Sequence, residues 1–223
     1  MSRTRTGALA LAGTLLAVLT PVSSAQATPS TVDESRLQPA LSPAFAPWDC
    51  KLKTTGPVCT GERHLEGNFG IIEDFGCSVP LWNTFTSDRY QTRYYDQDYR
   101  NVDRSFRTKD TDFLSTSPTG QGAATIDTHV RFTEPFAAPG DDTTRTIISS
   151  GTILEVRPVT GPALLRIVGT LVEPWNASAT FSGNITVDGV TTRYADVPYD
   201  SVFTFELFAD AVCRAATGLG AAL

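Results

Sequence analysis

The chain has 223 residues, with 18 basic side chains, 24 acidic side chains and two histidines. This length fits one domain of ordinary size, and the acidic balance disfavours generic binding to nucleic acids, whose phosphates it repels. The four cysteines form no C-x-x-C pair and the histidines are far apart in the sequence, which argues against a zinc or redox site.

The N-terminus has the features of a secretory signal peptide. Arg3 and Arg5 precede an uncharged apolar run over 7–19, and a small-residue triplet ends at Ala27. This order predicts a signal peptide over 1–27 that is cleaved after Ala27, and the run is shorter than the roughly 20 residues of a membrane anchor. We therefore expect a secreted, extracellular protein with no membrane anchor. Loss of Arg3 and Arg5 leaves 16 basic and 24 acidic side chains, a net charge of −8.

Three regions are expected in the mature chain. Residues 28–47 contain four prolines among Ser, Ala and Thr without a hydrophobic period, which predicts a flexible leader. A single β-rich domain should cover 48–217, and 218–223 should form a flexible tail. If the leader is flexible, Phe45→Ala should barely change the melting temperature.

Alternating apolar and polar residues dominate the domain. The segments around 124–132 and 179–188 place apolar residues on one face and Thr, Ser, Asn, Asp or charged residues on the other, the pattern of half-buried strands. Turn signals separate about eight such segments, near 81–95, 99–114, 122–133, 143–149, 151–157, 163–173, 179–188 and 190–195. Short turns require antiparallel neighbours. The predicted fold is mainly β: an antiparallel eight-stranded meander barrel, lipocalin-like, or a sandwich, with one C-terminal α-helix.

The helix is expected over 204–216, with Gly218 as its stop. It carries an apolar stripe that includes Phe208, and the strand near 163–173 is apolar on both faces. Each of these surfaces needs cover, so we expect the helix to dock on the outer face of that strand.

Four cysteines in an exported chain indicate two disulfides, which can pair in three ways. Cys50 and Cys59 bracket a short Gly-Pro loop, which favours a local bridge between them. The remaining bridge would join Cys77 to Cys213.

Several short motifs resemble those of a known group of proteins. They are Trp48-Asp-Cys-Lys, Gly56-Pro-Val-Cys-Thr-Gly-Glu-Arg, Tyr94-Tyr-Asp-Gln-Asp, Ser117-Pro-Thr-Gly and Ala211-Val-Cys-Arg. The chain from Trp48 to Cys213 resembles uncharacterised secreted β-rich proteins of high-GC Gram-positive bacteria. Many of these have a D-x-D-G turn where this chain has Asp96-Gln-Asp-Tyr99. The resemblance implies the fold and the extracellular location, and no chemistry.

The best candidate site is the basic, Tyr-rich segment between 89 and 107. Arginine and tyrosine together suit anionic or sugar-like partners through stacking and forked hydrogen bonds. A solvent-exposed hairpin with paired strands is the alternative explanation. His129 lies beside Asp127 on the polar face of its strand, an arrangement that could serve a general base or belong to a solvated face. The candidate ligand-binding residues are Arg89, Arg93, Tyr94, Tyr95, Arg100, Arg104 and His129.

These observations favour a non-catalytic binding or interaction module. Its ligand would be a small apolar molecule inside a barrel or a cell-envelope polymer on the surface. A secreted enzyme, such as a hydrolase or a cyclase-like barrel, is the second hypothesis, and a structural or inhibitory protein is the third. There is no G-x-S-x-G motif and no residue is assigned to catalysis. We expect a monomer without a cofactor, a metal or a nucleic-acid partner.

Overall fold

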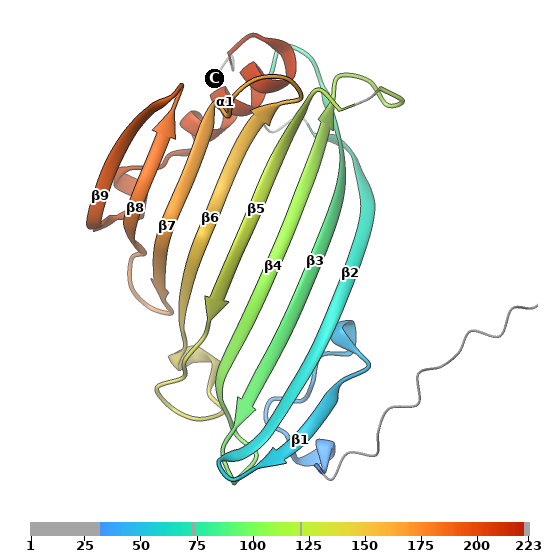
Figure 1. Ribbon diagram of the computed structural model, residues 1–223, viewed down its shortest axis with the longest axis vertical. Coiled ribbons are helices and arrows are strands. Elements are labelled where there is room, and N and C mark those ends of the chain that lie inside the picture. The colour runs from blue at the N-terminus through green and yellow to red at the C-terminus, as the bar shows by residue number, and fades with distance from the viewer. Residues whose placement is uncertain (1–31, 73–74, 121, 221–223) are drawn as a thin grey trace, which may run out of the picture.

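The computed structural model describes residues 32–72, 75–120 and 122–220 (Figure 1). The predicted signal peptide and its cleavage site lie outside these residues. Within them no helix is both long enough and apolar enough to cross a membrane.

The described chain forms one antiparallel sheet in which every strand pairs with its sequence neighbours (Figure 1). One of the shortest connections joins β8 to β9, where Asp188 and Gly189 both have positive φ, as a tight hairpin turn requires, and the connection from β5 to β6 is longer. The strands are β1 (Asp49–Lys53), β2 (Gly56–Ile72), β3 (Leu81–Tyr95), β4 (Asn101–Ser115), β5 (Ala124–Thr133), β6 (Thr146–Pro158), β7 (Leu165–Pro174), β8 (Thr180–Val187) and β9 (Val190–Pro198).

The sheet does not close. In the described chain β1 pairs only with β2 and β9 only with β8, and these two strands lie at opposite corners of the sheet (Figure 1). The mainly β, antiparallel prediction is confirmed. The structure has nine strands rather than eight, and it shows neither the closure of the expected barrel nor, among the described residues, the second sheet of a sandwich. The five-residue β1 is too short to complete a barrel wall.

Three strands differ from the prediction. The segment 49–72, which was not assigned, forms β1 and β2, and Gly61 and Gly67 within β2 hide its alternation. The predicted turn at Ser150-Gly151 lies inside β6, which merges two expected strands. Gly151 has φ of 126° and pairs with Gly169 on β7, so this glycine bends a continuous strand instead of ending it.

The pleat gives the sheet two different faces. We call the covered face the side that carries Leu81, Leu114 and Ile126, and the open face the side that carries Asp88, Lys109 and His129. The C-terminal helix and the N-terminal segment both pack on the covered face, at opposite ends (Figure 1). The described elements leave the open face to solvent.

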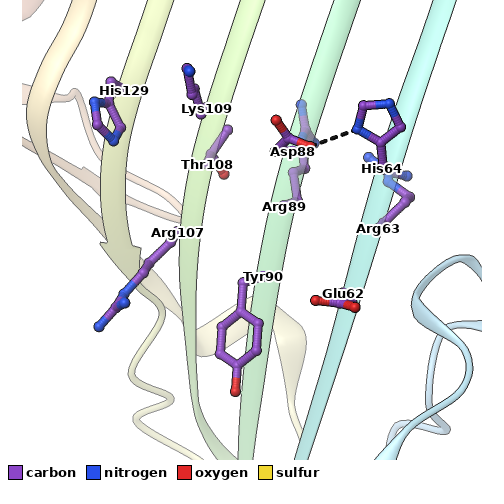
Figure 2. Close-up of a pocket in the computed structure, with 10 residues that line it drawn as sticks. All are labelled: Glu62, Arg63, His64, Asp88, Arg89, Tyr90, Arg107, Thr108, Lys109 and His129. Carbon is purple, nitrogen blue, oxygen red and sulfur yellow. Dashed lines mark hydrogen bonds and ion pairs between the residues drawn. The ribbon is translucent and has the colours of Figure 1, made fainter.

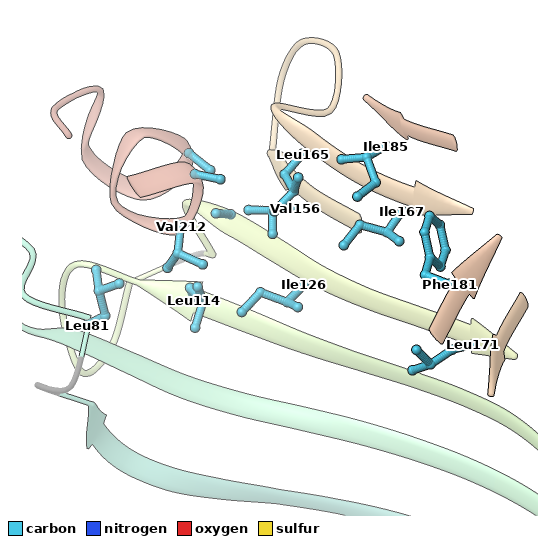
Figure 3. Close-up of a cluster of buried hydrophobic side chains, with 13 residues drawn as sticks. Leu81, Leu114, Ile126, Val156, Leu165, Ile167, Leu171, Phe181, Ile185 and Val212 are labelled. Atoms are coloured by element: carbon cyan, nitrogen blue, oxygen red, sulfur yellow. The ribbon is translucent and has the colours of Figure 1, made fainter. Parts of the chain in front are cut away.

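The helix α1 (Phe205–Thr217) confirms the predicted C-terminal helix. The Thr204 side chain accepts a hydrogen bond from the Leu207 amide, and Gly218 ends the helix in the left-handed conformation. A 3-10 turn, η4 (Tyr199–Ser201), leads into it. Ala211, Val212 and Ala215 of α1 complete a buried apolar cluster on the covered face (Figure 3). We call this the helix cluster; its buried sheet residues are Leu81, Leu114, Ala124, Ile126, Val156, Leu165, Ile167, Leu171, Phe181 and Ile185.

The position of α1 corrects the expected docking. The helix contacts β5 and β6 rather than lying along the strand near 163–173, although Leu165 and Ile167 of β7 belong to the same cluster. The Cys77–Cys213 disulfide ties the helix to the segment before β3 and so holds it over the end of the sheet. The strand β7 also has apolar residues on its other side: Val168 and Val172 lie on the open face of the sheet and are half-buried.

The two disulfides, Cys50–Cys59 and Cys77–Cys213, confirm both predicted pairings. The described chain contains no free cysteine. Two disulfides are typical of proteins that fold in an oxidising environment.

The expected flexible leader is wrong for residues 32–47. This segment contains two 3-10 turns, η1 (Glu34–Arg36) and η2 (Pro43–Phe45), and buries Val32 and Leu37 with Cys50, Cys59 and Tyr95 in an N-terminal cluster on the covered face. The backbone of Gln38 bridges to the β3–β4 turn: its N–H donates to the backbone carbonyl of Tyr99, and its carbonyl accepts from the backbone N–H of Asn101. The prolines here fix an extended, packed path instead of a mobile one.

A third turn, η3 (Asp142–Thr144), lies between β5 and β6.

Candidate functional site

The structure divides the predicted site residues among three places. Arg89, Arg93, Tyr95 and Arg104 point to the covered face, Tyr94 and His129 lie on the open face, and Arg100 lies at the β3–β4 turn. The reason is the period of two along a strand: Arg89 and Arg93 share one face of β3, while Tyr90 and Tyr94 share the other. The predicted patch is therefore not one surface.

Two of the covered-face arginines, Arg93 and Arg104, serve the fold. Arg93, which is 7% exposed, donates to the Ala40 carbonyl and stacks over Trp48, so it holds the N-terminal segment. Arg104 is equally buried and forms an ion pair with Glu134. At the turn, Arg100 pairs with Asp96 and Asp98, which accounts for the acidic residues of that loop.

The open face brings together residues that the sequence keeps far apart. His64 on β2, Asp88 on β3, Lys109 on β4 and His129 on β5 are consecutive cross-strand partners and form one row (Figure 2). Both histidines of the chain therefore lie in the same row. A second row, two residues further along the strands, contains Glu62, Tyr90, Arg107 and Arg131.

Four basic side chains form a block where these rows cross β4 and β5. Lys109 lies directly opposite His129, and Arg107 directly opposite Arg131. All four are exposed, and their side chains have no ion pair or hydrogen bond within the described chain. Like charges placed directly opposite each other destabilise a sheet. We call these residues the basic block; three permanent cations are concentrated here on a protein that is acidic as a whole.

His64 and Asp88 form the hydrogen-bonded pair of the first row. The His64 Nδ1 atom lies 2.6 Å from Asp88 Oδ1, and both side chains are about 60% exposed. The hydrogen bond to Asp88 raises the pKa of the imidazole above its ordinary value. The protonated form of His64 is therefore favoured in the folded state, and the stabilisation it gives is lost as the pH rises through the raised pKa. Asp88 is thus engaged by His64.

A shallow hollow with a volume of about 410 Å³ follows these rows across β2 to β5 (Figure 2). A second hollow of about 490 Å³ adjoins it and shares Tyr90 and Arg107. Tyr90 and Tyr94 are 44% and 37% exposed, so aromatic surface lies beside the guanidinium groups. Together the hollows offer cations, aromatic faces and hydroxyl groups over 88–94 of β3 and 105–109 of β4, and the carboxylates of Glu62 and Asp88 line the first hollow as well.

The sequence prediction included Arg107 and Tyr90 in the basic segment 89–107, but it missed Lys109, Arg131 and His64 and did not join these five residues into one surface. The alternation within 99–114 and 122–133 places Arg107 with Lys109 and His129 with Arg131 on single faces. The register between the two strands, which brings the pairs together, is not encoded by alternation alone. In the described part of the chain no group of three or more His, Cys, Asp or Glu side chains is placed to hold a metal ion.

Comparison of the chain with models of known protein families, with curated proteins and with solved structures found no match.

Proposed function

We propose that this protein is a secreted, non-catalytic binding module that holds an anionic polymer of the cell envelope on the open face of its sheet. The observation that carries the proposal is the basic block. Arg107, Lys109 and Arg131 are exposed and have no ion pair among the described residues, and Arg107 and Arg131 are like charges placed directly opposite each other, which costs stability in the free protein. Lys109 lies between His129 and Asp88, whose carboxylate is hydrogen-bonded to His64. An anion bound between β4 and β5 would remove that repulsion and gain charge-assisted hydrogen bonds.

The surroundings of the basic block favour an extended ligand. The two adjoining hollows share Tyr90 and Arg107, so binding groups continue along β3 and β4 beyond a single anion. Side chains two residues apart on a strand are separated by about 6.6 Å, and neighbouring strands by about 4.8 Å, which suits repeated phosphate or carboxylate groups. Tyr90 and Tyr94 add faces for stacking of the polymer backbone.

The apolar-ligand version of the binding hypothesis has weaker support. The apolar side chains of the covered face pack against α1 and against each other in the helix cluster. Secretion is supported by the signal-peptide pattern of 1–27 and by the two disulfides.

The proposal is tested by the affinity for sodium polyphosphate, measured by calorimetry at several salt concentrations, with neutral dextran as the reference polymer. The double variant Arg107→Ala/Arg131→Ala should bind polyphosphate at least about tenfold more weakly, a loss of roughly 1.4 kcal/mol. The slope of log affinity against log salt should also fall by about one to two, because two counterion-releasing contacts are lost.

Arg193→Ala is the matched control. Arg193 is an exposed arginine on the open face of β9, away from the basic block. Its replacement should leave the affinity unchanged. Equal losses in the control and the double variant would refute a site on β4 and β5, and so would binding of dextran as tight as that of polyphosphate.

A further inference from the structure

The middle of the covered face is polar. The helix cluster occupies one end of this face and the N-terminal cluster the other. Between them β3 presents Asn83, Phe85, Ser87 and Arg89 in succession on the covered side, and β4 presents Asp110 opposite Ser87. This part of the covered face carries amide, hydroxyl and charged groups, and neither apolar cluster accounts for the presence of these polar side chains.

Several of these polar groups have unused hydrogen-bonding capacity. Asn83 and Ser87 are each only 5% exposed, and Asn83 Oδ1 and Ser87 Oγ have no partner in the described chain. Asp110 accepts from Arg89 Nη2 through Oδ2, while its Oδ1 atom also has no partner there. Buried polar atoms without partners cost free energy, and natural proteins keep few of them without a reason.

An aromatic pair lies directly beside these groups. The rings of Phe69 and Phe85 stack with centroids 4.4 Å apart and an interplanar angle of 16°. Phe85 is between Asn83 and Ser87 on the same face of β3, and Phe69 lies at the bulge of β2 with 66% of its surface exposed. Gly67, opposite Phe85, leaves room for the ring, because a Cβ atom there would lie 2.8 Å from it.

We propose that this middle section of the covered face is a binding surface for a neutral saccharide. The apolar face of a sugar ring would stack on Phe69, and its hydroxyl groups would pair with Asp110, Arg89, Ser87 and Asn83. The Arg89–Asp110 ion pair, 2.8 Å long, balances the charge of this section, so it favours an uncharged ligand. The side chains of this pair are 38% and 24% exposed, whereas the unpartnered atoms Asp110 Oδ1, Ser87 Oγ and Asn83 Oδ1 are buried, so a ligand would pair with these atoms only after their side chains turn outward. The proposal concerns the face opposite the basic block and does not depend on it.

The test uses NMR titration of the isotope-labelled protein with chitotetraose and maltotetraose at millimolar concentrations, the range of weak saccharide binding. We expect shifts of the amides around Phe69, Phe85 and Asp110 with at least one of the two probes. Phe69→Ala and Asp110→Asn should each weaken that binding by about tenfold or more. Phe69→Ala keeps the test interpretable, because a side chain that is 66% exposed contributes little to folding.

Two controls separate this surface from the open face. Phe113→Ala removes an aromatic ring that is 39% exposed on the open face of β4, and should leave saccharide binding unchanged. Arg107→Ala/Arg131→Ala should also leave it unchanged, even where polyphosphate binding is lost. Absence of shifts with both saccharides, or shifts centred on the open face, would overturn the proposal. Failure of polyphosphate binding alone would bear only on the basic block.

Discussion

Asp112 shows how the covered face changes the chemistry of a single side chain. It lies on β4 opposite Phe85 and Ile126, at the border of the helix cluster, and burial raises its pKa above the ordinary value. The amide of Asn83 donates to Asp112 Oδ1 at 2.7 Å and offsets part of that effect. Because the folded-state pKa is raised, the ionised carboxylate costs stability at neutral pH, and the cost disappears as the pH falls through the raised pKa.

We therefore predict that Asp112→Asn is more stable than the parent at neutral pH. The asparagine oxygen can still accept from Asn83, while the buried charge is removed. The stability difference should shrink as the pH falls toward about 4, near the ordinary pKa of aspartate, where the parent carboxyl is protonated. Urea unfolding at a series of pH values measures this. The exposed Asp200→Asn is the control and should show no such gain; a less stable Asp112→Asn at neutral pH would contradict the prediction.

At the residue scale, the sequence identified the residue types of the candidate site but not the face of the sheet on which each side chain lies. It singled out the arginines and tyrosines of 89–107, yet Arg93 and Arg104 are buried structural residues, while Arg107 is exposed on the other face and has no ion pair among the described residues. The period of two separates Arg89 from Tyr90 in any strand, but which face is covered depends on where α1 and the N-terminal segment pack. That information is tertiary and is not carried by the strand itself.

At the scale of elements, the two disulfides have different roles. Cys50–Cys59 closes 9 residues and links β1 to β2, which are already paired as neighbours. Cys77–Cys213 spans 136 residues and connects the start of β3 to α1. In the chain-entropy description a longer closed loop restricts the unfolded chain more, so the long-range bridge should dominate the stabilisation.

We predict that Cys77→Ala/Cys213→Ala lowers the free energy of unfolding by about 5 kcal/mol, against about 2.5 kcal/mol for Cys50→Ala/Cys59→Ala. Chemical denaturation of both double variants beside the parent provides the comparison. Each variant serves as the control for the other, because both remove one bridge and two sulfur atoms. Equal losses, or a larger loss from the short bridge, would show that loop closure does not determine their effects.

The elements that the sequence predicted well are those with undisturbed alternation. Strands β3, β5 and β8 and the helix α1 appear close to their expected limits, and the cysteine spacing gave both bridges. The failures have local causes. Gly61 and Gly67 hid β2, and Gly151 looked like a turn because a glycine with positive φ serves both a turn and a bent strand. In residues 32–47, composition alone could not distinguish a packed proline-rich segment from a mobile one.

At the scale of the whole molecule, the coupling between the two apolar clusters determines whether the sheet unfolds as one unit. The helix cluster and the N-terminal cluster share no buried residue and are separated by the polar section of β3 and β4. However, β3 contributes Leu81 to the first and Tyr95 to the second, and β2 and β4 run the same length beside it. A strand that loses its neighbouring strands at one end also loses ladder hydrogen bonds toward its other end. Continuous strands should therefore couple the stability of the two clusters.

We predict a single cooperative unfolding transition that responds to damage in either cluster. Val212→Ala removes a fully buried side chain from the helix cluster, and should cost about 2 kcal/mol. Phe45→Ala removes a ring that is 7% exposed and packed against Trp48 and Phe106, and should cost about 3–5 kcal/mol, contrary to the expectation of a flexible leader. Scanning calorimetry should show each variant lowering the same melting temperature, with equal calorimetric and van't Hoff enthalpies.

Val190→Ala, at a site 71% exposed on β9, is the control and should change the melting temperature little. Two separate transitions, with each variant moving only one of them, would mean that the polar section divides the sheet into independent folding units.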